Sequence, residues 1–177
     1  MRTGKLLIAV MLLVLLAACG GGQQAEVPIF MMTKSGTASE TVKKLETALV
    51  EKLGESPTVS LGSTPVFSLE KLMVEVAAGG NGILIVPGEQ FHSFAKQGGF
   101  VSLDDIANPE DFPDGYIEQP VDGQPGKMEK HLYGIHLEKT KWFLDLGYNG
   151  KDLYAFIPQN SNDIEKAKQV MKVIAQK

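Results

Sequence analysis

The sequence predicts an α/β domain, a three-layer sandwich in which helices cover both faces of a mainly parallel central sheet. Short apolar runs and amphipathic segments alternate three times in the first half of the chain, which is the pattern of strands joined by crossover helices. Residues 83–86, Ile-Leu-Ile-Val, are wholly apolar, as expected for a central strand covered on both faces. The chain has 177 residues, enough for one such domain and too few for two ordinary ones.

The first strand and helix are predicted over residues 27–53. Residues 27–33, Val-Pro-Ile-Phe-Met-Met-Thr, form a short apolar strand, which a glycine-containing turn follows. Thr37 and Glu40 have the spacing of a capping box, and apolar residues then recur at intervals of three and four, as on one face of a helix: Val42, Leu45, Leu49 and Leu53. Gly54 would end this helix, because glycine adopts the backbone conformation that a C-cap needs.

The next two strand–helix units are shorter. Residues 58–62 are predicted as a strand, and Ser68 as the N-cap of a helix that ends at Gly79. The side chains expected to face inward from this helix are Leu69, Leu72, Met73, Val76 and Ala77. The apolar third strand ends at Pro87, and a short helix follows it, with these inward residues: Phe91, Phe94 and Ala95.

The second half of the chain is predicted to be less regular. Residues 104–127 are rich in Asp, Pro and Gly without a steady period, so we expect a long surface excursion there. The stretches 131–139 and 141–158 are predicted to be extended, with Asn149-Gly150 as the type I′ turn of a C-terminal hairpin. A last helix would begin at a cap formed by Asn162 with Glu165, and its inner face would carry Ile164, Ala167, Met171 and Ile174.

The amino-terminal segment predicts export and a lipid anchor. Two basic residues precede an unbroken apolar run at 6–16, which is long enough for a secretory signal and too short to span a bilayer as a helix. Leu16-Ala17-Ala18-Cys19 follows and resembles the bacterial lipobox, in which the cysteine receives a diacylglycerol and becomes the first mature residue. Cys19, the only cysteine, is therefore the predicted lipid attachment site. The alternative is an ordinary signal peptide cut after Ala18, which would leave a free thiol in an oxidising compartment.

These features divide the chain into three parts. Residues 1–18 are expected to be a lipoprotein signal peptide, residues 19–27 a lipidated flexible tether, and residues 28–177 a single α/β domain. Two acyl chains suffice to hold a protein on a membrane, so we expect the chain at the cell membrane, on its extracytoplasmic face. Without the leader, 15 basic residues stand against 21 acidic ones, which disfavours nucleic acid as a partner.

The order of these pieces resembles the extracellular solute-binding proteins of bacterial ABC importers, the periplasmic binding protein-like family, whose members are often lipoproteins. The similar stretches are ETVKKLETALVEKLG, GILIVPGEQFHSFAKQGGFVSLDDI, LYGIHL and AFIPQNSNDIEKAKQVMKVIA. Members of that family close two lobes around their ligand, whereas only residues 137–150 separate His136 from the late strand here. The resemblance therefore implies a single lobe without the second domain, which could cover only one side of a small ligand.

Six residues are candidate contacts for a ligand or a protein partner. Ser35 and Thr37 lie in the turn between the first strand and helix, where backbone N–H groups and hydroxyls can hold an anion; the preferred alternative is that Thr37 only caps the helix. The other four are aromatic residues near the irregular regions, where rings could stack on a sugar or on a partner's side chain: Tyr116, Tyr133, Trp142 and Tyr148. For Trp142, packing beneath the predicted hairpin is the preferred interpretation.

The sequence predicts no cofactor, metal site or catalytic group. The histidines, His92, His131 and His136, match no metal-binding spacing, and Asp104-Asp105 lacks the ligand spacing of a calcium loop. A Gly-x-Ser-x-Gly nucleophile elbow does not occur. We therefore expect a non-enzymatic lipoprotein, acting as a solute-binding module or as a protein-interaction module in assembly of the envelope, with a hydrolase as the least supported alternative.

Overall fold

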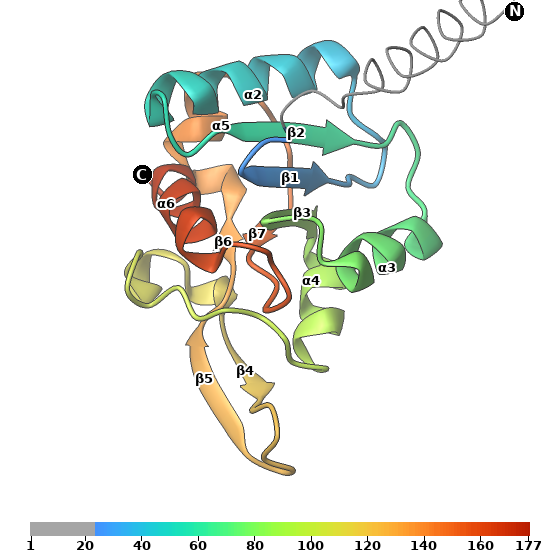
Figure 1. The fold of residues 1–177 in the computed structure, drawn as a ribbon, viewed down its shortest axis with the longest axis vertical. Coiled ribbons are helices and arrows are strands. Elements are labelled where there is room, and N and C mark those ends of the chain that lie inside the picture. The colour runs from blue at the N-terminus through green and yellow to red at the C-terminus, as the bar shows by residue number, and fades with distance from the viewer. Residues whose placement is uncertain (1–23) are drawn as a thin grey trace, which may run out of the picture.

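The structure, a computed structural model, describes residues 24–177, so Cys19, the predicted signal peptide and part of the predicted tether lie outside the described residues. The described chain folds into a five-stranded mixed sheet, five α-helices and a separate two-stranded ribbon (Figure 1). None of the helices in residues 24–177 is long and apolar enough to span a bilayer.

The central sheet has the strand order β2-β1-β3-β7-β6. Its members in chain order are β1 (Val27–Met31), β2 (Val59–Ser63), β3 (Ile83–Pro87), β6 (Ile135–His136) and β7 (Leu153–Phe156). β1 pairs in parallel with β2 and β3, whereas β7 is antiparallel to β3 and β6. The prediction of an α/β fold is confirmed. The prediction of a mainly parallel sheet is not, because half of the strand pairings are antiparallel.

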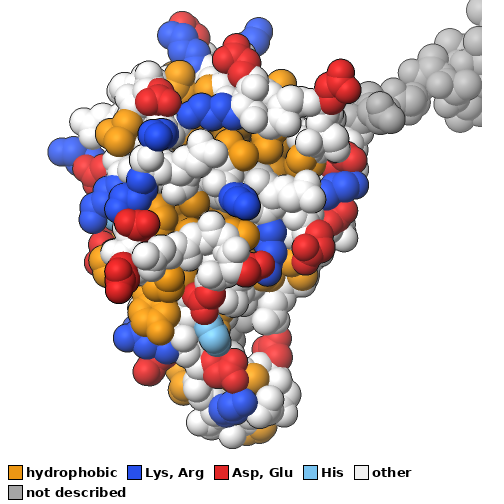
Figure 2. Space-filling model, turned by 90° about the vertical axis from the view of Figure 1, so that its left-hand side faces the viewer, with side chains coloured by type: hydrophobic (Ala, Val, Ile, Leu, Met, Phe, Trp, Pro, Cys, Tyr) orange, Lys and Arg blue, Asp and Glu red, His pale blue; other side chains and the backbone are white. Residues whose placement is uncertain are grey.

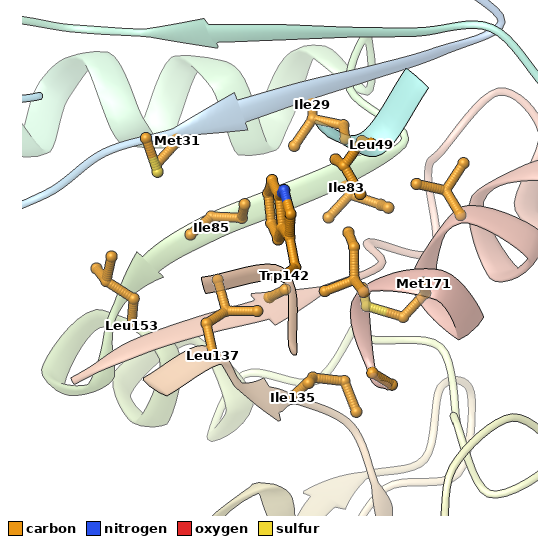
Figure 3. Close-up of a cluster of buried hydrophobic side chains, with 14 of the residues drawn as sticks. Ile29, Met31, Leu49, Ile83, Ile85, Ile135, Leu137, Trp142, Leu153 and Met171 are labelled. Atoms are coloured by element: carbon orange, nitrogen blue, oxygen red, sulfur yellow. The ribbon is translucent and has the colours of Figure 1, made fainter. Parts of the chain in front are cut away.

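Helices pack against both faces of the sheet, and each face has its own apolar cluster. One cluster joins the sheet to α2 (Ser39–Leu53), α5 (Lys141–Asp145) and α6 (Ile164–Ile174); Figure 3 shows Trp142 of α5 at the centre of this cluster. The other joins the opposite face to α3 (Leu69–Ala78) and α4 (Gly88–Ala95). Because successive strand residues point to opposite faces, every residue of β3 is buried, as its apolar sequence predicts.

The predicted surface excursion contains regular structure. After the short 3₁₀ turns at Pro109–Asp111 and Pro113–Gly115, β4 (Tyr116–Pro120) pairs antiparallel with β5 (Met128–Leu132). This ribbon projects from the body of the molecule (Figure 1). Both of its strands are partly exposed, so they lack the clean alternation of apolar and polar residues by which a strand is recognised.

The predicted C-terminal hairpin is wrong. Residues 141–145 form the helix α5 rather than a strand, since burial of Trp142 and Phe143 against α2 and the sheet determines their conformation. Asn149-Gly150 lies in the loop between α5 and β7. β7 pairs instead with β3, which is distant in the sequence, and with β6, from which α5 separates it. Short apolar runs do not distinguish helix from strand by periodicity, which explains the error.

The helix caps are partly as predicted. The Ser68 side chain accepts a hydrogen bond from the N–H of Lys71 and so caps α3, as expected. For α2 the N-cap is Ala38 rather than Thr37, without a side-chain hydrogen bond. For α6 the N-cap is Asp163, one residue beyond the predicted Asn162.

The inner face of α3 is narrower than predicted. Leu72 is fully buried and Val76 is partly buried against the second cluster. The other predicted inward residues are exposed: Leu69, Met73 and Ala77. The helix α3 therefore exposes apolar side chains to the solvent.

Candidate functional site: a crevice at the edge of the sheet

β1 and β3 are adjacent parallel strands whose following segments turn to opposite faces of the sheet. The chain leaves β1 toward α2 on one face and leaves β3 toward α4 on the other. In open α/β sheets, such a divergence opens a crevice at the carboxyl ends of the two strands, where ligands commonly bind. The structure has a crevice of about 270 Å³ at this place, which we call the switch-point crevice.

Three separate segments line the switch-point crevice. They are the turn at residues 33–35 after β1, Pro87 at the end of β3, and residues 148–151 with Leu153 at the start of β7. Its volume lies just below the 300–1,000 Å³ that is common for sites of drug-sized ligands. The crevice therefore suits a small solute that is held on one side.

Thr33 and Tyr148 line the crevice, and the hydroxyl of Thr37 lies close to both of their hydroxyls. The Oγ1 atoms of Thr33 and Thr37 are 3.3 Å apart, and Thr37 Oγ1 lies 3.4 Å from the hydroxyl of Tyr148. Tyr148 is positioned by Phe143, whose carbonyl accepts its N–H at 3.0 Å and whose ring packs edge-on against the tyrosine ring. Both hydroxyl contacts are long for O–H···O hydrogen bonds, so these groups can exchange them for shorter bonds to a ligand.

The charges at the crevice are mainly positive. Lys34 and Lys151 both line it. Lys34 Nζ lies 3.7 Å from Asp152 Oδ2, and both of these side chains are more than half exposed. Such an exposed pair contributes little stability, so an anionic ligand group could compete with Asp152 for Lys34.

Two helices begin at this edge without a side-chain cap. The N-cap of α2 is Ala38 and that of α4 is Pro87, and neither provides a side-chain acceptor. Their N–H groups add partial positive charge on the same side as the two lysines. The start of α4 also needs its glycine, because a Cβ at Gly88 would lie 2.9 Å from the buried ring of Tyr154.

A stack of aromatic rings lies next to the crevice. It is centred on Tyr154, which follows the crevice residue Leu153 in β7. The ring of Tyr154 stacks on Phe91 at 4.8 Å and on His136 at 4.7 Å between centroids. Burial raises the pKa of Tyr154 to about 12, and the carboxylates of Asp114 and Asp152 act in the same direction. The tyrosine therefore stays protonated and neutral near physiological pH.

The structure brings together three of the six predicted contact residues. Ser35 lines the switch-point crevice together with Tyr148, and Thr37 contacts Tyr148 from behind. Tyr116 lies on the ribbon, where the ammonium of Lys130 sits 5.0 Å from its ring centre. Tyr133 lies at the base of the ribbon, away from the crevice.

Trp142 is packed in the core, as the preferred interpretation of the sequence expects, but against a different element. It is fully buried, and its indole N–H donates a hydrogen bond to the carbonyl of Leu45 at 3.0 Å. It packs beneath α2 and not beneath a hairpin. Its ring has no exposed surface that a ligand could contact.

Sequence reasoning missed the two lysines of the crevice. Lys151 follows Asn149-Gly150, a pair that is typical of a turn, and Lys34 lies in the turn at residues 33–37, where the sequence indicates hydroxyl groups rather than a charge. Ser68 and Lys71 also have the Ser-x-x-Lys spacing of some hydrolases. Here the pair forms a helix cap, and Lys71 Nζ binds Glu75 at 2.8 Å.

Within residues 24–177, no group of three or more His, Cys, Asp or Glu side chains is arranged to hold a metal ion. Comparison of the chain with family models, curated proteins and solved structures found no match.

Proposed function

We propose that this chain is a membrane-anchored, extracytoplasmic lipoprotein that acts as a non-enzymatic solute-binding module. The observation that carries the proposal is the switch-point crevice, where three segments of the chain bring hydroxyl and ammonium groups to the carboxyl ends of β1 and β3. Helices on both faces of one open sheet also fit a single lobe of the solute-binding proteins that the sequence resembles. A lipid on Cys19 would be the anchor.

The crevice favours a small solute with an anionic group. Lys34 and Lys151 would attract a carboxylate, and the hydroxyls of Ser35 and Tyr148 would donate to it or to neighbouring polar atoms. A single lobe covers one side of such a ligand, so the affinity should be modest.

Thermal unfolding of the purified protein in the presence of small carboxylates, amino acids and sugars tests the solute-binding role. A ligand at 100 times its dissociation constant stabilises the folded state by about 2.7 kcal/mol, which is roughly 5–10 °C for a domain of this size. We expect at least one carboxylate to reach this shift. The absence of any shift across the panel would contradict the proposal.

A pair of lysine variants places that ligand in the crevice. We expect Lys34→Gln to weaken binding about tenfold, the loss of one charge-assisted hydrogen bond. Lys44→Gln is the matched control, because Lys44 pairs with Glu40 on the exposed surface of α2. If Lys34→Gln and Lys44→Gln bind the ligand with equal affinity, the ligand does not bind in the switch-point crevice.

Metabolic labelling with a radioactive fatty acid in a bacterial host tests the anchor. We expect the full chain to incorporate label and to fractionate with membranes, and Cys19→Ala to lose both properties. If instead the wild-type chain is unlabelled and its cysteine reacts with a maleimide, the ordinary signal peptide is the correct interpretation.

The exposed apolar residues of α3 favour a second candidate, a protein-interaction module of the cell envelope. Val66, just before the helix, is 70% exposed, and Met73 and Val74 are 58% and 64% exposed. Neighbouring apolar side chains on a surface often mark a protein contact. If no solute stabilises the protein but Met73→Lys abolishes a cross-link to an envelope protein, this candidate replaces the first.

A further inference from the structure

A second cavity lies between the ribbon and the body, and we call it the ribbon cleft. It has a volume of about 530 Å³ and is lined by residues 100–102 of the body, residues 119–122 of the ribbon, and Glu129 and His131 of β5, among others. It shares no lining residue with the switch-point crevice. The two sites lie beyond opposite ends of β7, since the crevice contains Leu153 and the cleft contains Gln159.

The ribbon is fixed to the body at the cleft. Gln119 is 3% exposed, its Nε2 donates to the carbonyl of Phe100 at 2.9 Å, and its Oε1 accepts the N–H of Phe100 at 3.3 Å. The N–H of Leu103 also donates to the carbonyl of Leu132 in β5 at 2.7 Å. The walls of the cleft are thus held by hydrogen bonds before any ligand arrives.

One carboxylate orients the histidine of the cleft. Asp104 accepts the N–H of Leu132 at 2.7 Å through Oδ1 and contacts Nδ1 of His131 at 2.6 Å through Oδ2. The other ring nitrogen, Nε2, lies 3.6 Å from Glu129 Oε2. Lys127 lowers the pKa of the Glu129 carboxyl, and His131 acts in the same direction. Asp104 therefore orients the histidine, and the histidine helps to keep Glu129 anionic at the cleft.

Two carboxylates line the cleft, among charges of both signs. Asp122 lines the cleft with Glu129, and Lys127 partly balances the latter by pairing with its other oxygen, Oε1, at 2.9 Å. Burial raises the pKa of the Tyr133 hydroxyl, and the charges of Glu129 and Asp104 raise it further. In the space-filling view, charged side chains of both signs lie on the lower end of the molecule, where the ribbon is located (Figure 2).

Another part of the cleft wall is apolar, although Ser102, Gln119 and Gln159 also line the cleft. The apolar side chains come from the body and from the end of β4 and include Phe100, Val101, Val121 and Ile164. A ligand that fits both parts has a cationic donor group at one end and a hydrocarbon chain at the other.

We propose that the ribbon cleft binds a small organic amine, whose ammonium group donates to the carboxylates of Glu129 and Asp122 while its hydrocarbon chain packs on Phe100 and Val121. This site is independent of the solute-binding role proposed for the switch-point crevice. The two sites select opposite charges, and either can exist without the other.

Titration of the ¹⁵N-labelled purified protein with hexylamine, followed by NMR, tests the proposal. We expect saturable shifts of the amide signals at residues 100–102 and 129–131. Hexanol and hexanoate have the same chain length without the cation and should leave these signals unchanged. No saturable shift with hexylamine, or equal shifts with hexanol, would overturn the proposal.

Two glutamates of the ribbon provide matched variants. Glu129→Gln should weaken hexylamine binding about tenfold, because it removes the charge that the ammonium meets. Glu118→Gln, in register with Lys130 on the opposite face of the ribbon, should change the affinity less than twofold, an order-of-magnitude estimate for a screened surface charge. Equal weakening by both variants would show a general charge effect and overturn the site. If Glu129→Gln fails to fold, titration of the wild-type protein with hexylamine, hexanol and hexanoate still tests the proposal.

Discussion

The body of the molecule and its ribbon are stabilised in different ways. In the body, apolar clusters lie on both faces of the sheet, and the central strand β3 is buried throughout. The ribbon has two partly exposed strands, and it is joined to the body by the hydrogen bonds of Gln119 and Asp104 and by Leu132 of β5, which is buried in the first apolar cluster. A two-stranded ribbon alone is marginally stable in water. The ribbon therefore needs the body.

The largest effect is expected in the body. Trp142→Ala should lower the free energy of unfolding by about 3–5 kcal/mol, because it leaves a cavity in the first apolar cluster and removes the indole donor from the carbonyl of Leu45. Urea unfolding followed by circular dichroism measures this loss. A loss below about 1 kcal/mol would mean that the tryptophan is not central to the body.

A smaller and local effect is expected in the ribbon. Gln119→Ala should cost about 1–3 kcal/mol, because the N–H and carbonyl of Phe100 lose their partners in a buried place. Hydrogen exchange should accelerate at the amides of β4 and β5 and remain unchanged in β3. Glu118→Ala is the control, since this exposed residue lies next to Gln119 on the other face of the ribbon. Uniform acceleration across the sheet would show that ribbon and body unfold as one unit.

A third effect is expected in the body and is confined to alkaline pH. The pKa of Tyr154 is raised from 10.0 to about 12, so the folded state holds this proton more tightly than the unfolded state does. The resulting stability is complete below pH 10 and is lost as the pH rises from 10 to 12. The difference in tyrosinate absorbance between the wild-type protein and Tyr154→Phe measures this ionisation. A midpoint near pH 10 would contradict the buried position of the hydroxyl.

The sequence allowed the first half of the body to be predicted well, because its elements carry strong local signals. The apolar run at 83–86 and the cap at Ser68 are examples, and the structure has a strand and a helix start at these places. The ribbon and α5 were missed because long-range contacts determine them. Trp142 belongs to a helix only through its packing against α2 and the sheet, which no local period encodes.

The candidate site was predicted only in pieces. Ser35, Thr37 and Tyr148 were each named for their own chemistry, but nothing local indicated that they would meet. They meet because β7 inserts beside β3 in the antiparallel direction, which brings the loop before Leu153 to the carboxyl ends of β1 and β3. The same pairing adds Lys151 to the crevice.

The direction of β1 also determines how the protein would stand on a membrane. The strand enters the sheet at Val27, the last residue of the predicted tether, and reaches the crevice side at Met31, about 13 Å farther along after four extended steps. A lipid on Cys19 would hold the Val27 end toward the bilayer, since a tether of this length spans only about 15 Å. The mouth of the crevice would then open outward, so that solutes arriving from outside the cell meet it before they meet the lipid headgroups.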